Sequence, residues 1–135
     1  MKFLLDENLP EVLSDGLQIL STGELYEVHH VIPRFGRGTL DVNWLQAAGK
    51  EGGWVVITND HHIKSRPHEI AAWRQHQITG FVLPKQFNQM TFWTKTAFLL
   101  RWWEEIVAAA REAKAGSMFP IPSKWTPSRL TRSTS

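Results

Sequence analysis

Three aspartates in this sequence are placed where carboxylates could hold a divalent cation. Asp6 follows the short apolar run 2–5, and Asp60 follows the apolar run 54–58. Asp41 stands at the start of a segment with helical periodicity. Converging carboxylates repel each other unless a cation lies between them, and Mg²⁺ or Mn²⁺ prefers such oxygen ligands. A site of this kind can activate water and stabilise a displacement at phosphorus.

Each of these carboxylates also has a structural explanation. Asp41 could cap its helix, since aspartate is a favoured N-cap residue. Asp60 could belong to the turn that follows its strand. Asp6 has no evident structural role, because Asn8 and Glu11 resemble a capping box that already serves the next helix. The ligand role is therefore best supported for Asp6.

The segment 59–69 is the most polar stretch near the expected site. Lys64 and Arg66 could contact phosphate groups of a substrate. Glu69 is a candidate for a further metal ligand, although an acid also suits the positive end of a helix. Asn8 is a third candidate for substrate contact, with the helix cap as its alternative role.

Strands and helices must alternate to bring these residues together. The apolar runs predict strands over 2–5, 26–32, 54–58 and 79–83, and helical spacing predicts helices over 9–21, 40–50, 67–77 and 91–115. This order predicts an α/β fold, a three-layer α/β/α sandwich with a mostly parallel sheet. Ligands bind beyond the carboxyl ends of such strands, where Asp6 and Asp60 would lie.

Composition and charge limit the remaining possibilities. A chain of 135 residues corresponds to one domain, and the absence of cysteine excludes disulfides, thiolate metal sites and thiol nucleophiles. The pI of about 9.2 comes mostly from the end of the chain, since residues 1–122 carry twelve basic and thirteen acidic side chains. We expect a domain over 1–122 and a basic, disordered tail over 123–135.

The ends of the chain and its apolar runs bear on localisation. The N-terminus reaches its first acids too early for a signal peptide. No apolar run approaches the roughly 20 residues that a membrane span needs. We therefore expect a cytoplasmic protein that does not contact a membrane.

The expected helix 91–115 is unusually rich in tryptophan and other large apolar residues. Its apolar surface is too wide for packing on one face of a sheet. We expect most of it to be core, and part of it to be an interface with a partner chain or with a second copy in a homodimer.

Several segments together resemble PIN-like domains, and the similarity is closest to VapC-type toxin ribonucleases of bacterial toxin–antitoxin modules. The resemblance rests on the start 1–10, on Asp41 three residues before Trp44, and on 55–60. It continues through 66–69, 81–85, Phe92-Trp93 and Arg101-Trp102. It covers about residues 1–122, and the ordered set of motifs is more specific than any one of them.

The resemblance implies a Mg²⁺- or Mn²⁺-dependent endoribonuclease whose carboxylates hold the metal while activated water attacks the RNA phosphodiester. Asp6 matches the first acid of the family, Asp60 matches the acid of its Thr-x-Asp motif, and Asp41 takes the place of a mid-chain acid that is usually glutamate. An antitoxin protein would occlude this site. The fourth acid of the family has no clear counterpart, and Glu69 or Asn8 is the candidate to replace it.

Two alternatives remain open. The missing fourth acid is consistent with a PIN-like binding module that has lost catalysis. A receiver-like phosphoacceptor domain would use the acid pair Asp6-Glu7, an acceptor at Asp60 and a lysine at Lys85. However, Lys85 follows Pro84, which reverses the usual order, and a tryptophan-rich final helix is foreign to receiver domains.

Overall fold

The computed structural model describes residues 1–35, 42–59, 67–126 and 130–132, without the side chains of 35, 42–45 and 67–69. Its strands are β1 (Lys2–Leu5), β2 (Glu27–His30), β3 (Trp54–Thr58), β4 (Thr79–Val82) and β5 (Met118–Pro120). Its helices are α1 (Glu11–Leu20), α2 (Val31–Phe35), α3 (Val42–Glu51), α4 (Pro67–Gln75), the 3₁₀ helix η2 (Lys85–Gln89) and α5 (Phe92–Glu112). The five strands pair in parallel in the order β2-β1-β3-β4-β5, which confirms the predicted α/β fold.

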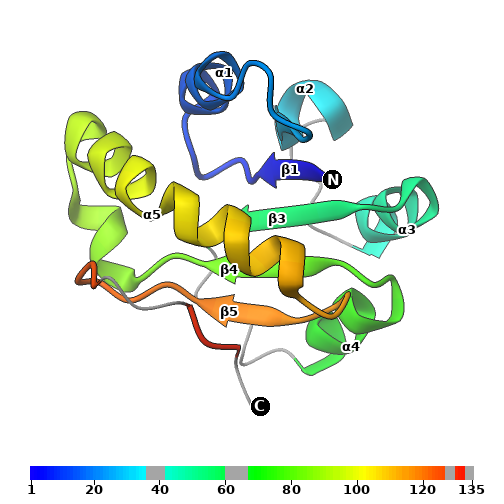
Figure 1. Ribbon diagram of the computed structural model, residues 1–135. Helices are drawn as coiled ribbons and strands as arrows, with labels where there is room; N and C mark the ends of the chain where they lie inside the picture. Colours follow the sequence, from blue (N-terminus) through cyan, green and yellow to red (C-terminus); the bar gives the residue numbers. More distant parts are fainter. Residues whose placement is uncertain (36–41, 60–66, 127–129, 133–135) are drawn as a thin grey trace.

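Helices cover both faces of the sheet. Successive side chains of a strand point to opposite faces, so Phe3 and Leu5 join one buried cluster with side chains of α1 and α5. Leu4 joins the other cluster with Val31 of α2, Ala48 of α3 and Trp73 of α4. Figure 1 shows α5 lying across the front of the sheet. The result is the predicted three-layer sandwich.

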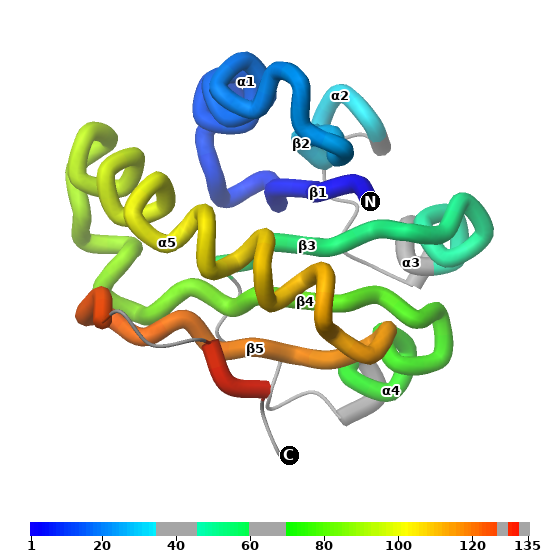
Figure 2. Tube along the Cα trace, in the orientation of Figure 1, coloured from blue at the N-terminus to red at the C-terminus, as the bar shows by residue number. Residues whose placement is uncertain are grey.

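The carboxyl ends of the central strands lie at one edge of the sheet. Leu5 of β1 is in register with Ile57 of β3, and Thr58 is in register with Val82 of β4. Figure 2 shows the chain running in the same direction through these three strands. Asp6 and Asn59, which follow β1 and β3, are therefore neighbours at this edge.

The predicted strand 26–32 ends earlier than expected, because residues 31–35 form the short helix α2. The backbone N–H of Ile32 donates to Nδ1 of His30 at 3.1 Å, which turns the chain out of the sheet. Pro33 is compatible with this helix because N–H groups of a first turn have no helical acceptor.

The opposite, amino edge of the sheet carries an ion cluster around Glu51. The carboxylate of Glu51 accepts from Trp54 Nε1 at 3.0 Å and pairs with Arg34 at 2.6 Å and Lys2 at 3.6 Å. Burial acts to raise the pKa of Glu51, but the Trp54 hydrogen bond and the two cations outweigh it and lower the pKa below its usual range. This edge is stabilised by paired charges.

Part of the C-terminal segment packs against the domain. The Arg101 guanidinium lies 3.8 Å from the centre of the Trp125 ring, and Leu130 is buried against the main core. These contacts differ from the disorder that we expected over 123–135. Residues 127–129 and 133–135 lie outside the described residues, and the domain boundary at residue 122 stays a prediction.

Helix α5 is mostly a core element, as expected. Its buried side chains are Leu99, Trp102, Trp103, Ile106 and Val107. Phe92, Trp93 and Leu100 remain exposed nearer the start of the helix. In the part of the chain that the structure describes, no helix combines the length and the apolar character needed to cross a membrane.

We predict that Gly80→Ala destabilises the domain by about 1–3 kcal/mol through overpacking. A Cβ at Gly80 would lie 2.6 Å from Cζ3 of the buried Trp73 ring and 2.9 Å from Sδ of Met118. The measurement is the free energy of unfolding in urea. Gly16→Ala is the matched control, since nothing lies within 4 Å of its Cβ position, and alanine in helix α1 should stabilise by about 0.5–1 kcal/mol. Equal effects of the two changes would contradict the prediction.

Candidate functional site

Asp6 lies fully buried at the carboxyl edge of the sheet. Its Oδ2 accepts hydrogen bonds from Oγ1 of Thr58 at 2.6 Å and from the backbone N–H of Asn59 at 3.0 Å. Its Oδ1 accepts from the backbone N–H of Asn8 at 3.0 Å. A buried carboxylate needs such partners, and bonds to an ionised group are stronger than neutral ones. Asp6 therefore has a structural role, contrary to the interpretation of the sequence.

The capping box predicted for Asn8 and Glu11 is wrong. Pro10 occupies the N-cap position of α1 without a side-chain hydrogen bond. The backbone N–H of Asn8 is engaged by Asp6, and that of Leu9 donates to the Asp6 carbonyl at 3.1 Å, so a turn separates β1 from the helix. The Asn8 side chain is exposed beside Asp6, and its contact with substrate stays a prediction.

A buried histidine holds this turn against the neighbouring strand. Nδ1 of His30 accepts from Ile32, so Nε2 carries the proton and donates to the carbonyl of Leu9 at 2.6 Å. The end of β2 thus fixes the backbone that follows Asp6 and Asn8. This histidine therefore has a structural role.

Asn59 is a residue of the site that the sequence analysis did not single out. Its side chain is buried, and its Nδ2 donates to Oδ1 of Asn88 at 2.5 Å. Its Oδ1 is buried and has no hydrogen-bond partner among the residues described. The exposed Asn88 of η2 is thereby linked through Asn59 to Asp6. The position of Asn59 directly after a strand was a usable signal, whereas Asn88 carried none.

The available oxygen atoms suit a hard divalent cation. A buried acceptor without a donor costs about 1–3 kcal/mol, and a cation or a ligand donor would offset this cost at Asn59. Carboxylate oxygens of Asp6 and the amide oxygen of Asn59 are both ligand types that Mg²⁺ and Mn²⁺ accept. Asp6 and Asn59 therefore supply oxygen atoms of the type that such an ion accepts.

Several predicted site residues cannot be placed. Asp41, Asp60, Lys64 and Arg66 lie outside the described residues, and the side chain of Glu69 in α4 is also outside them. Among the side chains that are described, no three histidines or acids gather in a way that could hold a metal. The convergence of the three aspartates therefore stays a prediction.

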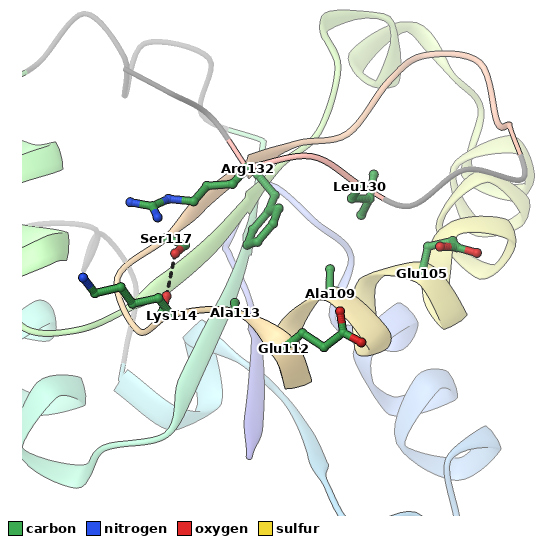
Figure 3. Close-up of a pocket in the computed structure, with 9 residues that line it drawn as sticks. Glu105, Ala109, Glu112, Ala113, Lys114, Ser117, Leu130 and Arg132 are labelled. Carbon is green, nitrogen blue, oxygen red and sulfur yellow. Dashed lines mark hydrogen bonds between the residues drawn. The ribbon is translucent and has the colours of Figure 1, made fainter.

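A separate pocket of about 260 Å³ lies between the end of α5, β5 and the C-terminal segment. Figure 3 shows Leu130 and Arg132 of that segment together with Lys114 and Ser117, whose hydroxyl donates to the Lys114 carbonyl at 2.5 Å. Ser117 precedes β5, which places the pocket toward the amino edge of the parallel sheet. It is therefore distinct from the edge that carries Asp6.

Comparison with known proteins gives one match. The family described as PIN like domain matches residues 1–85 of the chain. No curated protein and no solved structure gives a significant match. The matched segment contains Asp6 and Asn59 as well as Asp41, Asp60 and Glu69, so it includes every residue proposed to hold a metal.

We predict that Thr58→Val lowers the free energy of unfolding by about 1.5–3 kcal/mol, the usual value for a hydrogen bond to a charged group. The change removes the donor to the buried Asp6 carboxylate. The measurement is the free energy of unfolding in urea, with circular dichroism as the signal. Thr22→Val is the control, because the hydroxyl of Thr22 bonds an exposed backbone carbonyl, and its effect should stay within about 0.5 kcal/mol. A small effect at Thr58 would contradict a structural role of Asp6.

Proposed function

Because the chain belongs to the PIN-like domain family, we propose that it is a metal-dependent endoribonuclease, the toxin of a toxin–antitoxin module. The observation that carries the proposal is the buried Asp6 at the carboxyl edge, hydrogen-bonded to the end of β3 directly before Asp60. Asp6 and Asp60 follow neighbouring parallel strands. These hydrogen bonds therefore support the proposal that the two acids act together at the edge where α/β sheets bind ligands.

Asp6, Asp41 and Asp60 would hold Mg²⁺ or Mn²⁺, with Glu69 as a further ligand. The ion supplies the activation of water and the neutralisation of charge at the phosphodiester. The contribution of the protein is to fix Asp6 in one orientation, because Thr58, Asn59 and Asn8 all donate to its carboxylate. Ligands that are already oriented do not have to reorganise during the reaction.

Substrate contacts are proposed for residues around this edge. Lys64 and Arg66 supply positive charge that would contact phosphate groups of the RNA backbone. Such contacts carry no sequence information, but they fix the position of the RNA strand on the protein. The exposed amides of Asn8 and Asn88 lie on the turn after β1 and on η2. Amide groups can donate to phosphate or base atoms as well as accept from them. An antitoxin protein is proposed to cover this edge and block RNA.

The second candidate function is a PIN-like module that binds without catalysis. It is favoured by the absence of any aspartate or glutamate between Glu69 and Glu104, a span that includes the residues after β4. The receiver-like alternative is less well supported. The strand order observed here also occurs in receiver-type flavodoxin-like sheets, so topology does not separate the two, but the family match does.

We predict RNA cleavage by the wild type in Mg²⁺ or Mn²⁺, and a loss of at least about 100-fold in Asp60→Asn and Asp41→Asn, since such an ion contributes several kcal/mol to the transition state. The readout is single-turnover cleavage of labelled RNA. Asp15→Asn is the matched control, because Asp15 is exposed on α1. Asp6→Asn is a poor first test. The NH₂ group of the new asparagine would face hydrogen-bond donors that bond the carboxylate in the wild type, so the change would destabilise the fold as well as the site. Full activity in both site variants would reject the proposal.

We also predict that Mn²⁺ stabilises the folded chain. An ion that binds only the native state adds about 2.7 kcal/mol at a hundredfold excess over its Kd, so the melting temperature should rise by several degrees. The rise should persist in Asp15→Asn and disappear in Asp60→Asn. Absence of any rise in a folded wild type would favour the binding module that lacks a metal.

A further inference from the structure

Lys85 is an exposed cation at the carboxyl edge of the sheet to which the proposed function assigns no role. Its helix η2 follows β4, and the N–H of Leu83 between them donates to the carbonyl of Thr58 at 2.9 Å. Figure 1 shows the chain turning at this end of the strands, between β4 and α5. The lysine therefore begins the segment that passes the end of β3, to which Asp6 is hydrogen-bonded.

The face of η2 that meets the candidate site is defined by Asn88. The side chain of Asn88 contacts Asn59, whose backbone N–H bonds the carboxylate of Asp6. A 3₁₀ helix has about three residues per turn, so side chains three residues apart lie on the same face. Lys85 therefore shares the face of Asn88, about 6 Å away along the helix axis at a rise of about 2.0 Å per residue.

The position of this face is fixed by Phe87. Its side chain is fully buried in the main core, and its ring packs edge-on against Phe98 of α5 with 5.9 Å between ring centres. The N–H of Phe87 donates to the carbonyl of Pro84 at 3.0 Å. Because η2 is already held in place, a ligand that binds its outer face does not have to pay for ordering it.

Lys85 also differs from the other cations of this part of the chain. Residues 70–103 are all described and contain no aspartate or glutamate. Lys95 and Arg101 lie over aromatic rings, at 5.5 Å and 3.8 Å from the ring centres, and Arg74 belongs to the last turn of α4, ahead of β4. Lys85 forms no ion pair with another described residue. Its charge is therefore free to bind an anionic ligand at the carboxyl edge.

We propose that the Lys85–Asn88 face of η2 binds the backbone of the RNA substrate, with the Lys85 ammonium on a phosphate next to the one at the divalent ion. The identity of the ligand rests on the proposed function. Lysine binds phosphate as a compact point charge, and the amide of Asn88 beside it can donate as well as accept. The carboxylates proposed to hold the ion repel a phosphate backbone, whereas a fixed cation next to them favours its approach.

The test is the affinity for a labelled single-stranded RNA, measured by fluorescence anisotropy at several salt concentrations. Ca²⁺ replaces Mg²⁺, and a gel confirms that the RNA stays intact. One phosphate contact contributes about 0.7 to the slope of log K against log salt for single strands. Lys85→Ala should therefore lower this slope by about 0.7 and weaken binding about five- to tenfold at about 50 mM salt. Lys85→Arg should preserve both values because it keeps the charge. The side chain is exposed, so the variants should fold, and circular dichroism checks this.

Lys50→Ala is the matched control. Lys50 is also exposed, but it lies near the end of α3, just before the start of β3, and so at the opposite edge of the sheet. It should leave the affinity and the slope unchanged. Wild-type binding in Lys85→Ala, or an equal loss in Lys50→Ala, overturns the proposal.

Cleavage in Mn²⁺ is measured separately, so that the two proposals can fail independently. A wild type that binds RNA through Lys85 but does not cleave it supports the RNA surface and rejects only the proposed catalysis. A wild type that cleaves RNA and is unaffected by Lys85→Ala in affinity and slope rejects only the role of Lys85. A wild type that binds no RNA overturns both.

Discussion

The carboxylate of Asp6 is the interaction on which the functional edge of this domain depends. It is completely buried and bonds donors from its own turn and from the end of β3. Its removal would leave the Thr58 hydroxyl and two backbone N–H groups without their acceptor, at a cost of about 1–3 kcal/mol for each buried group. This one side chain connects the turn after β1 to the end of β3.

The same geometry limits what Asp6 can do as a metal ligand. A carboxylate offers about four lone-pair positions, and protein donors occupy at least three of those on Asp6. In the proposed function Asp6 is therefore one ligand among several, held rigidly, while Asp41 and Asp60 supply most of the coordination. Structural and chemical roles are compatible in this arrangement, because the hydrogen bonds that stabilise the fold also orient the oxygen atoms.

The layers of the fold were predictable because strands buried on both faces have a simple pattern. The uninterrupted apolar run of β3 has the predicted bounds, residues 54–58. Features that depend on contacts between distant segments were not predictable. The length of β2 and the start of α1 both depend on His30, which bonds Ile32 and Leu9. The Asn59–Asn88 contact depends on where η2 lies after β4, and spacing along the chain contains no such information.

Helix α5 shows why a pattern of tryptophans could not separate core from interface. The apolar residues recur with helical spacing along the whole helix, whether they are buried, as Trp102 is, or exposed, as Trp93 is. The difference arises from length. A helix of 21 residues is about 31 Å long, whereas the longest strand has 5 residues and spans about 17 Å. The sheet cannot cover the whole helix, so apolar side chains near its start, among them Phe92 and Trp93, remain exposed.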